Sequence, residues 1–233
     1  MTQDDVADVS RVERRCFSHP WPAAAYRREL RNRTQNYYVV LRAHLGEQSG
    51  ANGHNRPPAH LSESSRNRSR FQLLPFPRRS STPPTGPHIA GFAGMWTIFD
   101  EAHVTTIGVD PLHRGRGFGE LLFLALLDEA VRRGASFVTL EVRVSNTVAQ
   151  DLYQKYGLTI RGQKRGYYSD DGEDAFVMWS RSLRELPYLA HIEELRGQLA
   201  GRVGPTVTVP PAQHGPWVSN HSVEHLSHED QRQ

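Results

Sequence analysis

A glycine-rich run, Arg114-Gly115-Arg116-Gly117-Phe118-Gly119, stands directly before a long apolar segment that is typical of a helix. Glycines let the backbone approach a ligand closely and turn several N–H groups toward one concavity. The N-terminus of the following helix would add a partial positive charge. The run therefore predicts an anion site suited to a pyrophosphate. Taken alone, it is interpreted equally well as a plain turn between a strand and a helix.

Two other nucleotide-binding loops compete for this run. A P-loop needs a Gly-Lys-Ser/Thr sequence, which is absent. A dinucleotide-binding unit needs a third glycine where Glu120 stands and an acidic residue about 20 positions later, a place that Glu141 could fill. Glu120 would set a carboxylate at the phosphate turn, and the chain lacks the further βα units of a doubly wound sheet. Both alternatives are therefore disfavoured.

Two further residues could move protons. Glu141 lies among apolar strand residues, where partial desolvation would raise the pKa of a carboxyl group and suit it to act as a general base. Tyr153 follows Asn146 by seven residues, about two turns along the next helix and on the same face. Taken singly, an ion pair of Glu141 with Arg143 and core packing of Tyr153 are the commoner outcomes for such residues.

The elements that must position these residues alternate between helical and strand periods. Ser145 is expected to cap the helix that carries Tyr153, and glycines at 134 and 157 are expected to end two helices. We predict an α/β fold with a mixed sheet. The expected helices are 4–17, 23–31, 117–133 and 146–156, and the expected strands are 37–43, 88–98, 103–109, 137–144, 158–168 and 175–180.

The positive charge of the chain is concentrated in one segment. The 233 residues carry a formal net charge of +3, yet residues 45–87 alone hold six Arg and two Glu, so the remainder is close to neutral. That segment also holds seven Pro and seven Ser, a composition that cannot bury enough apolar surface to order itself. We predict a disordered insertion at 45–87, a disordered tail at 201–233, and one domain made of 1–44 and 88–200.

Several classes of protein and site are disfavoured. No apolar run is long enough to span a membrane, and the N-terminus has no signal-peptide pattern, which predicts a cytoplasmic protein without a membrane partner. A single cysteine, Cys16, excludes a disulfide framework. His221, His225 and His228 are a weak candidate for a metal site, and we expect no metal. The Arg-Ser run at 65–70 could touch RNA weakly, although a solvated linker is favoured.

The order of motifs resembles that of the GNAT acetyltransferases. The motifs are V-D-P, R-G-R-G-F-G, LEVRVSN, LYQKYG, RGYY and DGEDA, in that order along the chain. More narrowly, the chain is similar to the RimI-type ribosomal-protein-alanine N-acetyltransferases, which also share Glu13, Cys16-Phe17 and Pro20-Trp21. The resemblance covers about 5–44 and 88–182. It implies the GNAT fold, with acetyl-CoA as co-substrate.

The resemblance also implies roles for residues of this chain. The backbone of Ile107, Gly108 and Val109 would bind the pantetheine arm, and Asn146 would bind the cofactor further along. Glu141 would accept a proton from the incoming α-amino group through water, and Tyr153 would protonate the departing thiolate. Tyr167 and Tyr168, with Pro20-Trp21, would flank a peptide groove. The pyrophosphate would be held by the loop formed by Arg114, Gly115, Arg116, Gly117, Phe118, Gly119 and Glu120.

Glu120 departs from the family pattern, because a basic residue is common at that position, and an inward carboxylate would weaken phosphate binding. The expected reaction is acetylation of the N-terminal α-amino group of a protein, with the N-terminal alanine of a small-subunit ribosomal protein as the expected substrate. Two alternatives stay open. One is acetylation of a lysine side chain or a small amine by the same fold. The other is an RNA- or ribosome-associated binding protein that uses the basic insertion.

Overall fold

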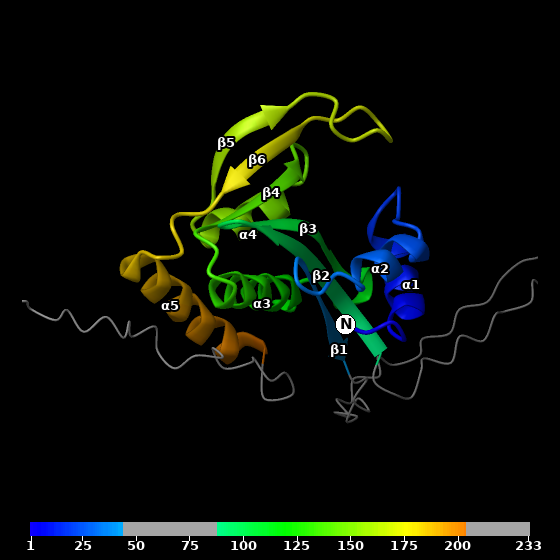
Figure 1. Cartoon of the computed structure of the whole chain (residues 1–233), viewed down its shortest axis with the longest axis horizontal. Helices are drawn as coiled ribbons and strands as arrows, with labels where there is room; N and C mark the ends of the chain where they lie inside the picture. The colour runs from blue at the N-terminus through cyan, green and yellow to red at the C-terminus, as the bar shows by residue number, and fades with distance from the viewer. Residues whose placement is uncertain (44–87, 204–233) are drawn as a thin grey trace, which may run out of the picture. The chain divides into compact units, whose positions relative to one another are not determined.

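The computed structural model describes residues 1–43 and 88–203, and Met1–Ala43 with the described residues from Ile89 onward belong to one unit. The expected insertion at 45–87 and the tail beyond 203 lie outside the described residues. Every expected helix and strand is present, with ends that differ by a few residues (Figure 1). The elements are α1 (Val6–Cys16), α2 (Ala23–Glu29), β1 (Asn36–Ala43), β2 (His88–Ile98), β3 (Glu101–Val109), α3 (Phe118–Arg132), β4 (Phe137–Arg143), α4 (Thr147–Lys155), β5 (Thr159–Lys164), β6 (Ala175–Trp179) and α5 (Leu186–Val203).

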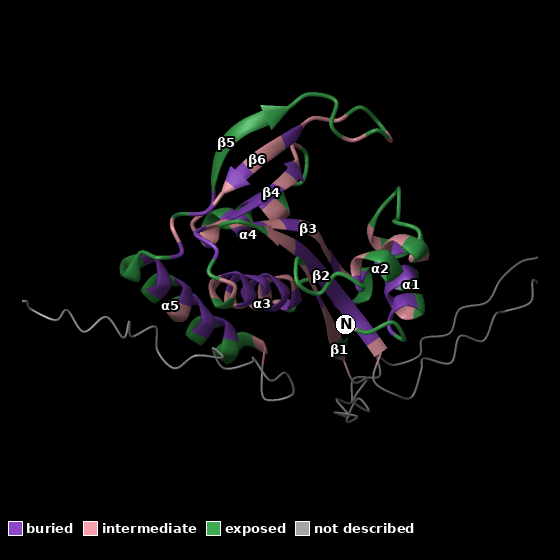
Figure 2. Cartoon of the chain, viewed as in Figure 1, coloured by how far each residue is buried: buried purple, intermediate pink, exposed green. Residues whose placement is uncertain are grey.

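The described strands form one sheet in the order β1-β2-β3-β4-β6-β5. β3 and β4 run parallel, whereas β2 with β3, β4 with β6, and β5 with β6 run antiparallel. The prediction of a mixed α/β sheet is therefore confirmed. β1 and β5 are the edge strands, and all six residues of β5 are exposed (Figure 2).

Helices cover both faces of the sheet, each over its own apolar cluster. On one face the largely apolar α3 packs on β4, and residues of α3, α4 and α5 share one apolar cluster with the even-numbered β4 residues Val138, Leu140 and Val142. On the other face α1 and α2 pack over β1 and β2 around Tyr26 and Phe92 (Figure 1). Because side chains alternate along a strand, the odd-numbered residues of β4 point away from α3.

β3 and β4 are paired over only part of their length. The parallel ladder runs from Glu101 opposite Phe137 to Val104 opposite Leu140. Beyond it β3 continues beside β2, and β4 continues beside β6. The break coincides with an irregularity in the β2–β3 ladder, where Thr105 is the extra residue. A bulge bends and twists the strand that contains it, so β3 turns away from β4 at this point.

Helix α5 was not predicted. The predicted domain reached residue 200 without an element there, and the predicted tail began at 201, inside this helix. Leu189, Ile192 and Leu195 lie on its buried face, at the spacing that a helix places on one side. Another correction concerns α4, because its N-cap is Asn146, which accepts a hydrogen bond from the backbone of Ala149 at 3.2 Å, and not Ser145. Of the helices that the structure describes, none is long and apolar enough to cross a membrane.

Candidate active site

The glycine loop shapes the start of α3, where the sequence predicts an anion site. Gly115 and Gly117 have φ values of +74° and +79°, in the left-handed region that favours glycine. α3 begins at Phe118, and none of the described side chains caps it. The first N–H groups of a helix have no partner within the helix, so they are free to meet phosphate oxygens. Gly119 lies inside the helix and needs no unusual backbone conformation.

The Glu120 carboxylate is turned away from the loop and toward α4 and α5. It accepts hydrogen bonds from Lys155 Nζ at 2.5 Å, from the Tyr156 hydroxyl at 3.2 Å and from Arg202 at 2.7 and 2.8 Å. Partial burial works to raise its pKa, but the bonds from Lys155 and Arg202 outweigh burial and lower it. Glu120 is therefore an ionised residue that ties three helices together, and it presents no inward carboxylate to a phosphate.

The last residues of β3 have one backbone edge without a strand partner in the described part of the chain. Ile107, Gly108 and Val109 pair with β2 on one side, while β4 has already separated on the other. The Val109 carbonyl accepts from Cys16 Sγ at 3.3 Å and from Arg114 Nε at 3.2 Å. The free edge suits an extended ligand that pairs as a strand would. The roles of these residues toward pantetheine stay a prediction.

Glu141 comes directly after the last β3–β4 pair, on the face away from α3. Its side chain is 8% exposed. One carboxylate oxygen accepts from Lys164 Nζ at 2.7 Å, and the other lies 3.1 Å from His103 Nε2. Arg143 is not its partner, because that guanidinium binds Asp170, Asp171 and Glu173 instead.

The expectation that burial raises the pKa of Glu141 is wrong. The hydrogen bond with His103, together with the bond from Lys164, outweighs desolvation and lowers the pKa to about 2. A carboxylate with two such partners is stabilised in its charged form, which burial among apolar residues alone would disfavour. Glu141 is therefore ionised at neutral pH and is a strong hydrogen-bond acceptor, but it holds a proton poorly.

Tyr153 lies on the opposite face of the sheet from Glu141. It belongs to the apolar cluster under α3, with its ring 5.3 Å from that of Phe123. Burial raises the pKa of its phenol, so the hydroxyl stays protonated at neutral pH. Among the described residues the hydroxyl has no hydrogen-bond partner. A ligand could touch both Glu141 and Tyr153 if it entered where β3 and β4 are unpaired.

Asn146 has a structural task besides the predicted contact with a cofactor. Its side-chain oxygen caps α4, which leaves the Nδ2 group available to donate a hydrogen bond. Asn146 is exposed at the loop that joins β4 to α4. Its role toward a cofactor stays a prediction.

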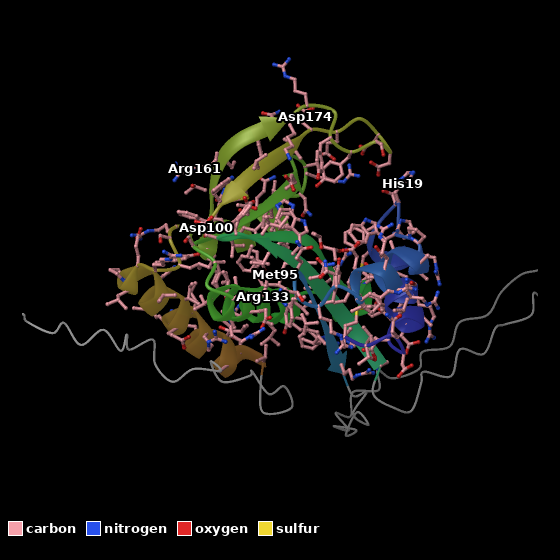
Figure 3. All side chains as sticks on the ribbon, viewed as in Figure 1. His19, Met95, Asp100, Arg133, Arg161 and Asp174 are labelled. Carbon is pink, nitrogen blue, oxygen red and sulfur yellow. The ribbon has the colours of Figure 1, made fainter. Side chains whose placement is uncertain are left out.

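Two loops that are distant in sequence meet at Asp170. Asp170, in the β5–β6 loop, accepts a hydrogen bond from Ser18 Oγ and lies 3.4 Å from His19 Nδ1. Figure 3 shows His19 at the tip of the α1–α2 loop, on the side facing the β5–β6 loop. The Arg143 guanidinium binds Asp170 and stacks 3.9 Å from the centre of the Tyr168 ring. Arg143 thus fixes the β5–β6 loop from β4.

The residues expected to flank a peptide groove lie on these two loops. Tyr167 is 45% exposed, and its ring lies 5.2 Å from that of Tyr168. On the other loop, the buried Glu13 carboxylate accepts from the backbone N–H of Trp21 at 3.0 Å and so holds Pro20-Trp21 in place. The arrangement supports a groove between the two loops, which stays a prediction.

Sequence reasoning missed His103, Thr139, Glu101 and Lys164. His103 Nδ1 lies 2.9 Å from Thr139 Oγ1, and the Thr139 hydroxyl donates to Glu101 at 2.5 Å. These four residues and Glu141 are the Glu141 network. A pattern of alternating residues could have indicated them. In β3, Glu101 and His103 alternate with apolar residues, and in β4, Thr139 and Glu141 do the same. Only the registers of β3 with β4, of β4 with β6 and of β5 with β6 bring these residues together.

Comparisons with known proteins identify the family of this chain. The sequence pattern of the Acetyltransferase (GNAT) family matches residues 60–158. The chain is 30% identical over 179 residues to the putative [ribosomal protein bS18]-alanine N-acetyltransferase of Bacillus subtilis, covering 77% of this chain and 91% of that protein. This chain belongs to the GNAT acetyltransferase family. It is an acetyl-CoA-dependent N-acetyltransferase.

Other relatives of this GNAT enzyme give the same result. The N-alpha-acetyltransferase RimI of Mycobacterium tuberculosis is 33% identical over 184 residues, covering 76% of this chain and 87% of that protein. The crystal structure of the ribosomal-protein-S18-alanine N-acetyltransferase from Escherichia coli has the same fold, with a TM-score of 0.55 at 24% identity over 79% of this chain and 92% of that one. The resemblance to RimI-type enzymes is confirmed.

Proposed function

We propose that this enzyme transfers the acetyl group of acetyl-CoA to the N-terminal α-amino group of a protein. The proposed substrate is the N-terminal alanine of a small-subunit ribosomal protein, in keeping with the names of its relatives in Bacillus subtilis and Escherichia coli. A ribosomal substrate implies a cytoplasmic enzyme. Acetyl-CoA would lie along the free edge of β3, with its pyrophosphate at the N–H groups of Gly115 to Glu120 and with Asn146 further along.

The observation that carries the proposal is that Glu141 and Tyr153 lie on opposite faces of the sheet, with Glu141 directly after the last β3–β4 pair, where the two strands separate. A thioester held in that opening would have a carboxylate on one side and a phenol on the other. The α-amine would come from the Glu141 side, where the two loops joined by Asp170 lie. Such an arrangement suits direct attack of the α-amine on the thioester, because neither Glu141 nor Tyr153 needs to form a covalent intermediate.

The chemistry required is modest for an α-amine. An α-ammonium group has an ordinary pKa near 8, so only a small shift is needed to release the nucleophile, whereas a lysine ammonium titrates near 10.4. Glu141 would accept the hydrogen bond of the ammonium and orient its nitrogen toward the carbonyl carbon. Tyr153 would donate a hydrogen bond to the sulfur as the carbon–sulfur bond breaks. The sulfur then leaves as a thiol.

The test is a matched panel of peptides incubated with the full chain and acetyl-CoA. Each peptide starts with Ala, Ser, Thr or Met on a common sequence that contains one internal lysine, and a second set carries a blocked α-amine. Mass spectrometry with fragmentation locates the added acetyl group. We expect acetylation of the free α-amine, fastest for Ala, and none in the blocked set. Acetylation confined to the lysine, or no product from any peptide, would contradict the proposal.

A further inference from the structure

The last turn of α5 packs against the glycine loop at a single residue, Gly117. A Cβ added to Gly117 would lie 2.7 Å from a Leu199 methyl and 3.0 Å from a Val203 methyl, so both side chains already contact the backbone there. Leu199 is fully buried. At Gly115 an added Cβ would meet nothing within 4 Å. The loop is therefore open at Gly115 and covered by α5 where α3 begins.

Two ion pairs hold α5 along α3. Arg196 pairs with Asp128 at 2.5 Å in the second half of α3, and Arg202 pairs with Glu120 at 2.7 Å in its first turn. The two helices therefore run antiparallel, with the end of α5 at the start of α3 (Figure 1). α5 lies beyond residues 60–158, which the GNAT family pattern matches. The contact with the loop is thus made by a part of the chain outside that pattern.

A loop of this composition gains from being held. Glycine loses more conformational freedom on ordering than any other residue, and this loop contains three glycines. None of the described side chains caps α3, so no cap fixes the left-handed backbone of Gly117. A site that is ordered before its ligand arrives avoids that entropic cost on binding. Packing of Leu199 and Val203 on Gly117 supplies such order from outside the loop.

Resting on the proposed function, which places the pyrophosphate of acetyl-CoA at this loop, we infer that the last turn of α5 holds the loop in its binding conformation. Leu199 and Val203 are positioning residues that act through Gly117. The ion pair between Arg202 and Glu120 keeps that turn of α5 on α3. Loosening the turn should weaken the binding of acetyl-CoA and leave the chemical step alone.

The experiment compares Leu199→Ala with Leu195→Ala in the full chain by calorimetric titration with acetyl-CoA. Both leucines are buried on one face of α5, one turn apart. Leu199, and not Leu195, has a side-chain atom within 4 Å of a Cβ built at Gly117. Urea unfolding should show similar losses of stability, because each variant leaves a cavity of the same origin. We expect Kd to rise about tenfold in Leu199→Ala and less than about twofold in Leu195→Ala.

Kinetics separate a positioning role from general damage. In Leu199→Ala the KM for acetyl-CoA should rise about as much as Kd, while kcat at saturating acetyl-CoA stays within about twofold of wild type. Leu199→Met keeps most of the side-chain volume and should restore the affinity. Val203→Ala removes less from the same contact and should raise Kd about threefold, so it tests the inference even if Leu199→Ala does not fold.

Two results would overturn the inference. An equal rise of Kd in Leu199→Ala and Leu195→Ala would show that loosening α5 anywhere has the same effect. An unchanged Kd in folded Leu199→Ala and Val203→Ala would show that the loop keeps its shape without α5. The titration needs no acceptor. Wild-type enzyme that binds acetyl-CoA but acetylates no peptide would therefore overturn the proposed function, while the comparison of the variants would still decide the role of α5.

Discussion

One half of the candidate site is formed by backbone groups and the other half by side chains. At the start of α3 the predicted anion site consists of backbone N–H groups in a loop shaped by Gly115 and Gly117. Beside β4 the proposed proton-transfer site consists of side chains, the Glu141 network, brought together from β3, β4 and β5. The first site depends on conformation and the second on register and charge. They should therefore fail in different ways when altered.

The backbone-built site should be broken most severely by Gly117→Ala. The residue has a left-handed φ of +79°, and an added Cβ would lie 2.7 Å from a Leu199 methyl and 3.0 Å from a Val203 methyl. We expect a loss of about 2–5 kcal/mol in the free energy of unfolding, from backbone strain and overpacking together. Urea unfolding measures this loss, and calorimetric titration with acetyl-CoA should show weakened binding in whatever folds.

Gly115→Ala is the matched control for that change. Its φ of +74° is equally left-handed, but an added Cβ meets nothing within 4 Å. Only the strain of about 1–2 kcal/mol should remain. Equal losses in the two variants would show that contact between α5 and the loop contributes nothing.

The Glu141 network should make the free energy of unfolding depend on pH. The pKa of Glu141 is lowered from 4.5 to about 2, by His103 first and then by Lys164, against desolvation. A carboxyl whose folded pKa is depressed stabilises the fold above its unfolded pKa and loses that contribution as pH falls through the folded value. We expect about 3 kcal/mol from this group at pH 7, lost between about pH 5 and pH 2.

The measurement compares urea unfolding of wild type and Glu141→Gln at pH 7 and at pH 2.5. The difference between the two proteins should be large at pH 7 and should shrink markedly at pH 2.5. Glu185→Gln is the control, because Glu185 is an exposed residue in a surface pair with Arg181 at 3.0 Å and should give a small difference at both pH values. A Glu141→Gln difference that is independent of pH would contradict the assigned cause.

The same contrast explains what the sequence could predict. The glycine loop and the helix after it are local features, so their residue types alone indicate the site. The ends of β2, β3 and β4 were also predicted closely, because apolar periodicity marks them. Glu13, in α1, was singled out only by the family resemblance, not by periodicity.

Long-range pairing was what the sequence could not supply. The pKa of Glu141 was predicted in the wrong direction because its partners His103 and Lys164 lie 38 and 23 residues away in the chain. They meet it only through the registers of β3 with β4, of β4 with β6 and of β5 with β6. Helix α5 was missed because Arg196 interrupts its apolar face, although this buried residue pairs with Asp128 at 2.5 Å.

Tyr153→Phe removes one oxygen, the phenol hydroxyl of the proposed proton donor, and leaves the glycine loop unchanged. We expect kcat to fall about a hundredfold, because proton donation to the departing sulfur is lost. The affinity for acetyl-CoA, measured by titration, should be nearly unchanged, since the backbone-built site is intact. Stability should also change little, because the hydroxyl has no hydrogen-bond partner among the described residues.

Tyr156→Phe is the control one turn further along. Its hydroxyl donates to Glu120 at 3.2 Å, so the loss should be about 1 kcal/mol of stability with kcat within a few-fold of wild type. If Tyr153→Phe left kcat unaltered while Tyr156→Phe lowered it, the proton donor would have to be reassigned.

The smallest expected effect is that of Glu120, and it tests whether the charge of this residue affects acetyl-CoA binding at the glycine loop. Glu120 lies in the first turn of α3 yet directs its carboxylate to Lys155 and Arg202. Glu120→Gln should therefore cost about 1 kcal/mol in stability through weaker contacts with those cations. The affinity for acetyl-CoA should change by less than about threefold, since one unit of charge behind the loop is largely screened. If removing the charge strengthened binding tenfold or more, the Glu120 carboxylate would have to face the phosphates, and N–H groups alone would not account for the site.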